Sequence, residues 1–249
     1  MKLKYFISIA VFLSVLNNVQ AQLIEPRGIA GVQNLNNYLK WAGQDMRTLA
    51  NSDLAPGIPW SRVTGSPFWN DNWRLASLYD KNDKIIATLP VRLNLNTSSV
   101  HFINQQGEEL SLDPEGIRRV VFLQDTLSGP GAVFISYVPY AYFGDTKNNN
   151  YLQVMNQGKA SLLAYKRRYV GSGDSASPGH QRYYYKNEVS YYIAINNKVE
   201  RLKKLGKEQV FMLLPGANAF DRWVTENKLN MKKEADIKKF IDYYNSERK

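Results

Sequence analysis

Apolar residues recur at helical spacing near the start of the chain. Between residues 31 and 50 they stand three or four positions apart, at Val32, Leu35, Leu39, Ala42, Met46 and Leu49. This spacing places all six side chains on one stripe of a helix, so we predict a helix over residues 31–50. The stripe either packs on the protein's own sheet, which we favour, or contacts a protein partner, because the spacing also suits a short coiled coil.

Residues 61–202 change to short β-prone stretches that are separated by turns. Strands that follow one another without intervening helices pair antiparallel, which predicts a meander, a sandwich or an open barrel. Alternation of apolar and polar side chains over residues 91–95 predicts that this strand has one face in water. The candidate strands are Arg74–Tyr79, Ile85–Leu95, Val100–Ile103, Glu109–Leu112, Arg119–Leu123, Val133–Val138, Leu152–Met155, Ala160–Arg168, Tyr183–Lys186, Tyr191–Ile195 and Lys198–Leu202.

The last part of the chain, residues 203–249, returns to helical spacing. One helical face collects Phe220, Trp223 and Val224, and a second collects Ile237, Phe240, Ile241 and Tyr244. We expect this segment to pack on the β domain. The whole pattern predicts an α+β, β-dominated fold with an N-terminal helical segment over residues 22–60, an antiparallel β domain over 61–202 and a C-terminal helical segment over 203–249.

The first 21 residues have the order of an export signal. Lys2 and Lys4 precede an apolar run from Tyr5 to Leu16, and Val19 and Ala21 suit the small-residue pockets of a signal peptidase. The run is shorter than the roughly 20 residues of a membrane-spanning helix. We therefore expect cleavage after Ala21 and an exported protein without a transmembrane segment, in the periplasm or at the cell surface or beyond it.

Composition limits the chemistry of the chain. Its 249 residues include no cysteine, which excludes disulfides, thiolate metal sites and cysteine nucleophiles. Two histidines are too few for a histidine-rich metal site. No glycine-rich phosphate loop, His-Glu-x-x-His pattern or calcium-loop spacing is present. We expect no metal, no cofactor and no catalytic site, and we interpret His101, inside a candidate strand, as a packed or hydrogen-bonded residue.

Positive charge is concentrated in the second half of the chain. Residues 151–249 hold 19 basic and 10 acidic groups, against 11 and 12 in residues 22–150. Such charges most often form a solvated surface, and their functional interpretation is an anionic partner, here a glycan or another envelope component and not nucleic acid. Tyrosine faces can stack on sugar rings, although cross-strand tyrosine pairs across a hairpin would also stabilise a sheet. The candidate binding residues are Lys166, Arg167, Arg168, Arg182, Tyr183, Tyr185 and Tyr191.

Two patterns support a hydrolase as the alternative function. Gly173-Asp174-Ser175-Ala176 shares its first three residues with serine hydrolase signatures, but it lies in a Gly-, Ser- and Pro-rich stretch, which is typical of a loop. Pairs of acidic residues, in Glu108-Glu109, in Asp113-Pro114-Glu115 and at Asp80 and Asp83, are the second candidate for acid–base chemistry. We favour a non-enzymatic binding or structural role over a hydrolase that uses Ser175 or a carboxylate pair.

Four motifs and the export signal, in this order, resemble those of a family of uncharacterised secreted Bacteroidota proteins. The motifs are Gly65-Ser66-Pro67-Phe68, Leu89-Pro90-Val91-Arg92-Leu93-Asn94, Gln157-Gly158-Lys159 before Leu162-Leu163, and the close from Lys228-Leu229 to Tyr243-Tyr244-Asn245. The resemblance spans most of residues 62–245 and implies export but no activity. Bacteroidota attach O-glycans at Asp-(Ser/Thr)-apolar sites, so this lineage implies modification at Thr126 and Ser175, a second use for Ser175.

Overall fold

A large open mixed sheet dominates the protein, between a helical segment at one end of the chain and helices at the other. The computed structural model describes residues 31–38, 47–48, 63–114, 116–124, 130–136, 150–173, 182–196 and 198–248. The strands are β1 (Arg47–Thr48), β2 (Val63–Thr64), β3 (Arg74–Tyr79), β4 (Ile85–Asn94), β5 (Ser99–Ile103), β6 (Glu109–Leu112), β7 (Arg119–Phe122), β8 (Ala132–Ser136), β9 (Tyr151–Val154), β10 (Ala160–Gly173), β11 (Arg182–Ile195) and β12 (Lys198–Leu202). The helices are residues 31–38, α2 (Lys207–Leu213), the 3-10 helix η2 (Ala217–Phe220), α3 (Asp221–Glu226) and α4 (Glu234–Glu247).

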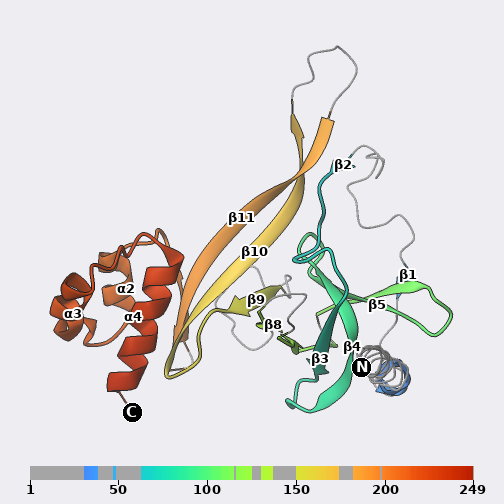
Figure 1. Ribbon diagram of the computed structural model, residues 1–249, viewed down its shortest axis with the longest axis horizontal. Coiled ribbons are helices and arrows are strands. Elements are labelled where there is room, and N and C mark those ends of the chain that lie inside the picture. The colour runs from blue at the N-terminus through green and yellow to red at the C-terminus, as the bar shows by residue number, and fades with distance from the viewer. Residues whose placement is uncertain are drawn as a thin grey trace, which may run out of the picture.

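The strands form one sheet in the order β1-β6-β5-β4-β3-β7-β8-β9-β10-β11-β12, and every neighbouring pair in this order is antiparallel. Most neighbours also follow one another in the chain, as expected for hairpins. The predicted β-dominated, antiparallel fold is thereby confirmed. One pair differs, because β2 joins β11 in parallel and makes the sheet mixed (Figure 1).

The N-terminal helical segment packs on the sheet through its apolar stripe. Val32 and Leu35 are buried in the same hydrophobic cluster as β3, β4 and β5. Gly31 permits the close approach, because a Cβ at this position would lie 2.3 Å from the carbonyl oxygen of Thr88 in β4. The described part of the stripe therefore packs on the protein's own sheet, as favoured above.

The predicted extent of this helix was wrong at its end. Arg47 and Thr48 form β1 and pair with Ser111 and Leu110 of β6, so residues 47–48 do not continue a helix from residue 31. The unpaired edge of β6 offers backbone hydrogen bonds that outweigh the helical period of the side chains. The rest of the stripe lies outside the described residues: Leu39, Ala42, Met46 and Leu49. The contact with a protein partner that these residues would make is therefore not tested.

The second face of β4 is covered, although the alternation over residues 91–95 predicted a face in water. Val91 and Leu93 are buried in the core, as expected. On the opposite face Asn94 is also buried, and the guanidinium of Arg92 lies 3.9 Å from the ring centroid of Phe68. The segment before β3 folds over this face, so polar side chains point into the protein.

The C-terminal helices cover one face of β10, β11 and β12 and form a second hydrophobic core. Ile237, Phe240, Ile241 and Tyr244 of α4 are all buried there, which confirms the predicted helix face. Asn245 joins the helix to β10, because its side-chain amide accepts from the N–H of Ala160 and donates to the carbonyl of the same residue. Gly158 leaves the space for this amide, since a Cβ there would lie 2.3 Å from Nδ2 of Asn245.

No helix among the described residues is both long and apolar enough to cross a membrane.

Candidate functional site

A two-stranded ribbon projects from the sheet and carries most of the candidate binding residues. β10 pairs with β9 only over residues 163–165, and β11 pairs with β12 only over residues 191–195. Beyond these points β10 and β11 continue as partners of each other, and of the other described strands β2 joins them at two residues. Residues 166–173 and 182–189, called the ribbon below, extend past the neighbouring strands (Figure 1).

The predicted turn between two tyrosine-containing strands was wrong. Residues 182–195 form one strand, in which Asn187 and Glu188 pair with Arg168 and Arg167 of β10. Tyr183 and Tyr185 therefore pair with β10 and not with Tyr191. A long partner strand supplies hydrogen bonds to residues whose local preference is for a turn.

The ribbon separates the predicted binding residues onto two faces, because residues opposite each other in an antiparallel pair point the same way. One face turns toward residues 63–68 and holds Lys166, Arg168, Tyr183 and Tyr185. The second, called the open face below, consists of Arg167, Tyr169, Gly171 and Gly173 of β10 with Arg182, Tyr184, Lys186 and Glu188 of β11.

On the first face Arg168 anchors the chain before β3. Its guanidinium Nη1 donates to the backbone carbonyls of Ser66 and Phe68, the former at 2.7 Å. Its Nε donates to Oδ1 of Asn187 at 3.1 Å, and its backbone N–H donates to the carbonyl of Leu95. Arg168 is thus engaged inside the protein, although the sequence placed it in a cluster of binding cations.

The open face places cations beside tyrosine rings. The guanidinium of Arg167 lies 5.5 Å from the ring centroid of Tyr169, and Nζ of Lys186 lies 5.4 Å from that of Tyr184. Arg167, Arg182 and Lys186 make no ion pair with any described residue, and Glu188 is the single acid on this face. Tyr169, Tyr184 and Lys186 were not among the candidates from the sequence, although a two-residue period along residues 182–186 joins Tyr184 and Lys186 to Arg182. Tyr169 joins this face only through the pairing of β10 with β11.

Two glycines give the open face its shape. A Cβ at Gly171 would lie 2.5 Å from Cε of Lys186, and a Cβ at Gly173 would lie 3.0 Å from the ring of Tyr184. The side chains of β11 therefore lie across β10 where β10 has none. The side chains of Tyr184 and Lys186 thus cover the backbone of β10 at Gly171 and Gly173.

Tyr191 lies at the other end of β11, apart from the ribbon. Its hydroxyl donates to Oε2 of Glu234 at 2.7 Å and so attaches β11 to the first turn of α4. Burial, the hydrogen bond to Glu234 and the charge of that carboxylate together raise the pKa of Tyr191 from 10.0 to about 12, and burial has the largest effect. This geometry supports a structural role for Tyr191.

The raised pKa predicts a pH dependence that the variant Tyr191→Phe should lack. A folded-state pKa above the unfolded value adds stability below about pH 10, and this stability is lost as the pH rises through about 12. The variant is expected to be less stable by about 1 kcal/mol at pH 8, from the lost hydrogen bond, and the difference should shrink toward pH 11.5. Urea unfolding of both proteins across this range measures it, and a difference independent of pH would contradict the assignment.

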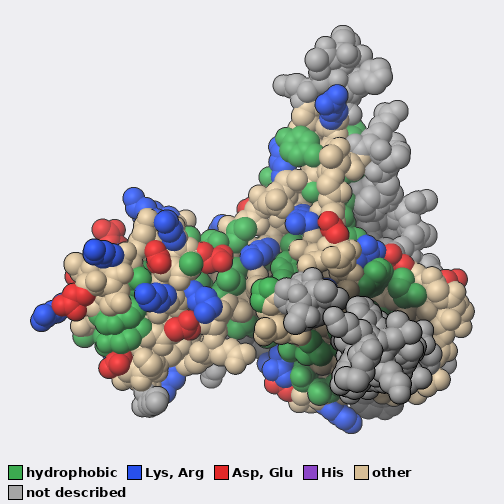
Figure 2. All heavy atoms as spheres, viewed as in Figure 1, with side chains coloured by type: hydrophobic (Ala, Val, Ile, Leu, Met, Phe, Trp, Pro, Cys, Tyr) green, Lys and Arg blue, Asp and Glu red, His purple; other side chains and the backbone are tan. Residues whose placement is uncertain are grey.

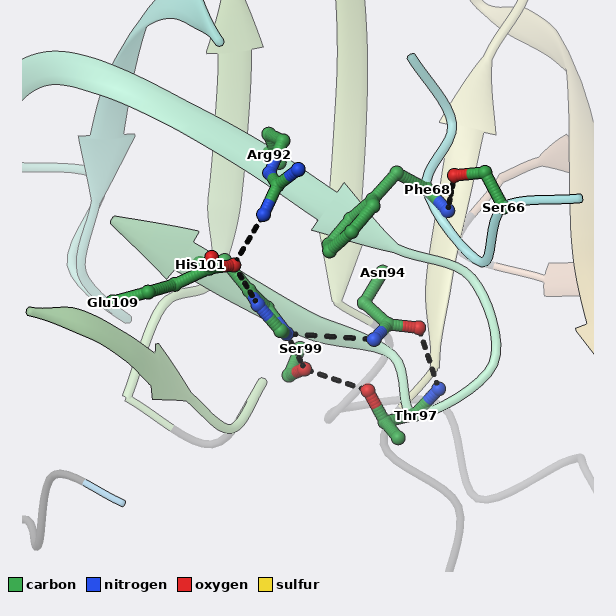
Figure 3. Close-up of polar contacts among 8 residues, drawn as sticks. All are labelled: Ser66, Phe68, Arg92, Asn94, Thr97, Ser99, His101 and Glu109. Atoms are coloured by element: carbon green, nitrogen blue, oxygen red, sulfur yellow. Dashed lines mark hydrogen bonds and ion pairs between the residues drawn. The ribbon is translucent and has the colours of Figure 1, made fainter. Parts of the chain in front are cut away.

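A buried polar cluster lies on the second face of β4, β5 and β6 (Figure 3). Nε2 of His101 lies 3.0 Å from Oγ of Ser99, and Nδ1 lies 2.8 Å from Oε1 of Glu109. The same carboxylate oxygen pairs with the guanidinium of Arg92 at 2.5 Å. His101 is therefore hydrogen-bonded inside the sheet, which confirms its interpretation from the sequence.

Ser99, His101 and Glu109 are linked in the order of a serine hydrolase triad. They could be catalytic only if a substrate can reach the hydroxyl of Ser99. Ser99 is 3% and His101 1% exposed, and the serine hydroxyl also contacts Oγ1 of Thr97 at 2.7 Å. A nucleophile has to reach a substrate carbonyl at about 3 Å. The ring of Phe68 stands edge-on over His101 with 5.0 Å between the centroids. The burial supports a structural role, in which the cluster holds three strands and the segment before β3 together.

The acidic residues proposed for a carboxylate pair have other partners where the structure describes them. Asp80 is buried, and its Oδ1 accepts from the backbone N–H groups of Asn82 and Lys84, which closes the turn before β4. Oε2 of Glu108 accepts from the side-chain amide of Asn104. Glu115 lies outside the described residues. Over the described part of the chain, no group of three acidic or histidine side chains is arranged to hold a metal ion.

The remaining sequence predictions lie outside the described residues. These are the export signal with cleavage after Ala21, the candidate nucleophile Ser175, and the O-glycosylation sites at Thr126 and Ser175.

Comparison with known proteins adds no relative from which a role could be transferred. No family model matches the chain, and no curated protein or solved structure shows significant similarity to it. The resemblance to secreted Bacteroidota proteins therefore stays a prediction. Among the described residues, the arrangement best suited to contact another molecule is the open face of the ribbon, with its three cations and two flanking tyrosine rings.

Proposed function

We propose that this protein is an exported, non-enzymatic envelope protein that binds an anionic glycan through the open face of its ribbon. The observation that carries the proposal is the set of three cations, Arg167, Arg182 and Lys186, which have no ion-pair partner among the described residues. They stand on a ribbon that extends beyond the sheet, where a large partner can reach them.

The chemistry of this face suits a sugar polymer with acidic groups. Tyrosine rings stack on the apolar faces of sugars, and the flanking cations attract sulfate or carboxylate groups. Arg182 and Lys186 stand four residues apart on β11, about 13 Å along a strand. A single small anion cannot contact both, whereas an extended polymer can. The predicted export signal is consistent with a partner in the cell envelope.

Removing the three cations together tests the proposal. The variant Arg167→Ala/Arg182→Ala/Lys186→Ala is expected to bind heparin, used as the anionic polysaccharide probe, about tenfold more weakly, since an exposed charge pair contributes up to about 1 kcal/mol. Wild-type binding should also weaken steeply as NaCl rises from 50 to 300 mM. Biolayer interferometry with immobilised heparin measures both effects.

A matched control separates this site from the net charge of the protein. Lys198, Lys203 and Lys239 are exposed on the C-terminal part of the chain, and their replacement by alanine removes the same charge. This control variant should bind heparin almost as tightly as the wild type. Equal weakening of the two variants would show that heparin responds to net charge alone and would reject the site.

A further inference from the structure

A groove in the C-terminal helical segment is separate from the ribbon. It has a volume of about 1140 Å³ and lies between α2 and the chain that runs from α3 to Lys232. Figure 2 shows lysine and arginine side chains, interspersed with acidic ones, over these helices. All the residues that line the groove belong to the described part of the chain.

The groove has an apolar floor with methionine at its side. Val224 and Met231 are buried beneath it, and Phe211 stacks on Phe240 with 5.2 Å between the ring centroids. Met212, which also lines the groove, is 68% exposed, more than any other exposed large apolar side chain of the described residues. Methionine is flexible and polarisable and is frequent where a surface accommodates an amphipathic peptide.

Lysines surround this floor. Lys207 forms an ion pair with Asp221, whereas Lys204, Lys228 and Lys232 pair with no acid among the described residues. Beside Asp221, Glu208 is the only other acid that lines the groove. The rim therefore keeps a positive excess after its internal pair is counted.

Lys228 holds an unusual backbone conformation at this rim. Its φ is +52°, in the left-handed region, and it closes α3 through hydrogen bonds from Lys228 N–H to Thr225 and from Leu229 N–H to Val224. Glycine is the residue that takes this helix-ending position without steric strain. Lysine here holds a conformation that favours glycine, and its charged side chain lines the groove.

We infer that this groove binds an acidic, amphipathic helix of a partner protein. The volume exceeds the roughly 300–1,000 Å³ of small-molecule pockets, and the groove is open to solvent. A lipid chain in it would leave one side of its hydrocarbon in water, whereas an amphipathic helix turns its polar face outward. Glutamate or aspartate beside the apolar stripe of that helix would meet Lys204, Lys228 and Lys232.

A designed peptide supplies the probe. It is a fluorescein-labelled helix of 18 residues with leucine at i, i+3, i+4 and i+7 positions and mainly glutamate elsewhere. The control peptide has the same composition with the leucines spread around the helix. Fluorescence anisotropy with the chain from residue 22 onward should show saturable binding of the first peptide and at least tenfold weaker binding of the second, because only the first has an apolar face.

Substitutions locate the binding. Met212→Glu should weaken binding of the amphipathic peptide about tenfold, by placing a charge in the apolar contact. Lys228→Gly should weaken it about threefold while raising the melting temperature, because glycine relieves the backbone strain. If Lys228 had only a structural role, Lys228→Gly would not weaken peptide binding while raising the melting temperature. The ribbon variant Arg167→Ala/Arg182→Ala/Lys186→Ala should bind the peptide as the wild type does, so this test is independent of the proposed function.

Four outcomes would overturn the inference. The first is equal affinity for the two peptides, and the second is binding that Met212→Glu leaves unchanged. The third is co-sedimentation with phosphatidylglycerol vesicles that Met212→Glu abolishes, without peptide binding, which would make a membrane the occupant. The last is a concentration-dependent mass in sedimentation that Met212→Glu abolishes, which would make a second copy of this chain the occupant.

Discussion

The variant His101→Ala is expected to lower the free energy of unfolding by about 3 kcal/mol. The substitution removes an imidazole that is 1% exposed and leaves a cavity under the ring of Phe68. It also deprives Ser99 and Glu109 of a hydrogen-bond partner inside the sheet. Unsatisfied buried polar groups add to the loss from the cavity, so this effect should be among the largest of any single polar substitution.

Urea unfolding followed by circular dichroism measures this effect, with Ile103→Ala as the control. Ile103 lies two residues further along β5, on the same face, but it is 36% exposed. Its replacement should lower the free energy of unfolding by about 1 kcal/mol or less. If the two variants lost similar stability, the polar cluster would not hold the strands together in the way we describe.

Arg168→Ala should destabilise the protein by about 2–4 kcal/mol, whereas Arg167→Ala should change stability by less than about 0.5 kcal/mol. The two arginines are neighbours in β10 but lie on opposite faces of the ribbon. Arg168 donates from its side chain to Ser66, Phe68 and Asn187. Arg167 is exposed, and its side chain lies beside the ring of Tyr169.

The same denaturation experiment compares both alanine variants with Arg168→Lys. Lysine keeps the charge but not the planar fork of donors, so it should recover less than half of the lost stability. Full recovery by lysine would mean that charge alone matters at this position. Heparin binding should show the reverse order, with the larger loss for Arg167→Ala.

Local patterns predicted the elements whose preference agrees with their place in the fold. The strands over residues 74–79, 109–112 and 198–202 have the predicted bounds. The buried face of α4 follows from its three- and four-residue spacing, because a helix exposed on one side must bury the other. The interpretation of His101 as hydrogen-bonded also followed from its place in a strand.

Other features depended on partners that are distant in the sequence. The turn expected near Asn187 and Glu188 was wrong because β10 pairs with both residues. The helix expected to reach residue 50 was wrong because β6 pairs with Arg47 and Thr48. The face of β4 expected in water is covered because the segment before β3 folds over it.

The candidate sites show the same division. The basic second half and the tyrosine run are evident in the sequence, and most of the candidate residues that they contributed lie on the ribbon. The separation of Arg167 from Arg168, the distance of Tyr191 from the ribbon and the groove beside Lys228 required the tertiary structure.

By itself, the sequence determined the β-dominated class, the helical end and the position of the excess charge, because hydrophobic period and composition are local properties of a chain. Only the tertiary structure decided which cations are hydrogen-bonded inside the protein and which have no ion-pair partner among the described residues. Hydrogen bonds such as those from Arg168 to Ser66 and Phe68 join residues about a hundred positions apart, and no local pattern specifies them.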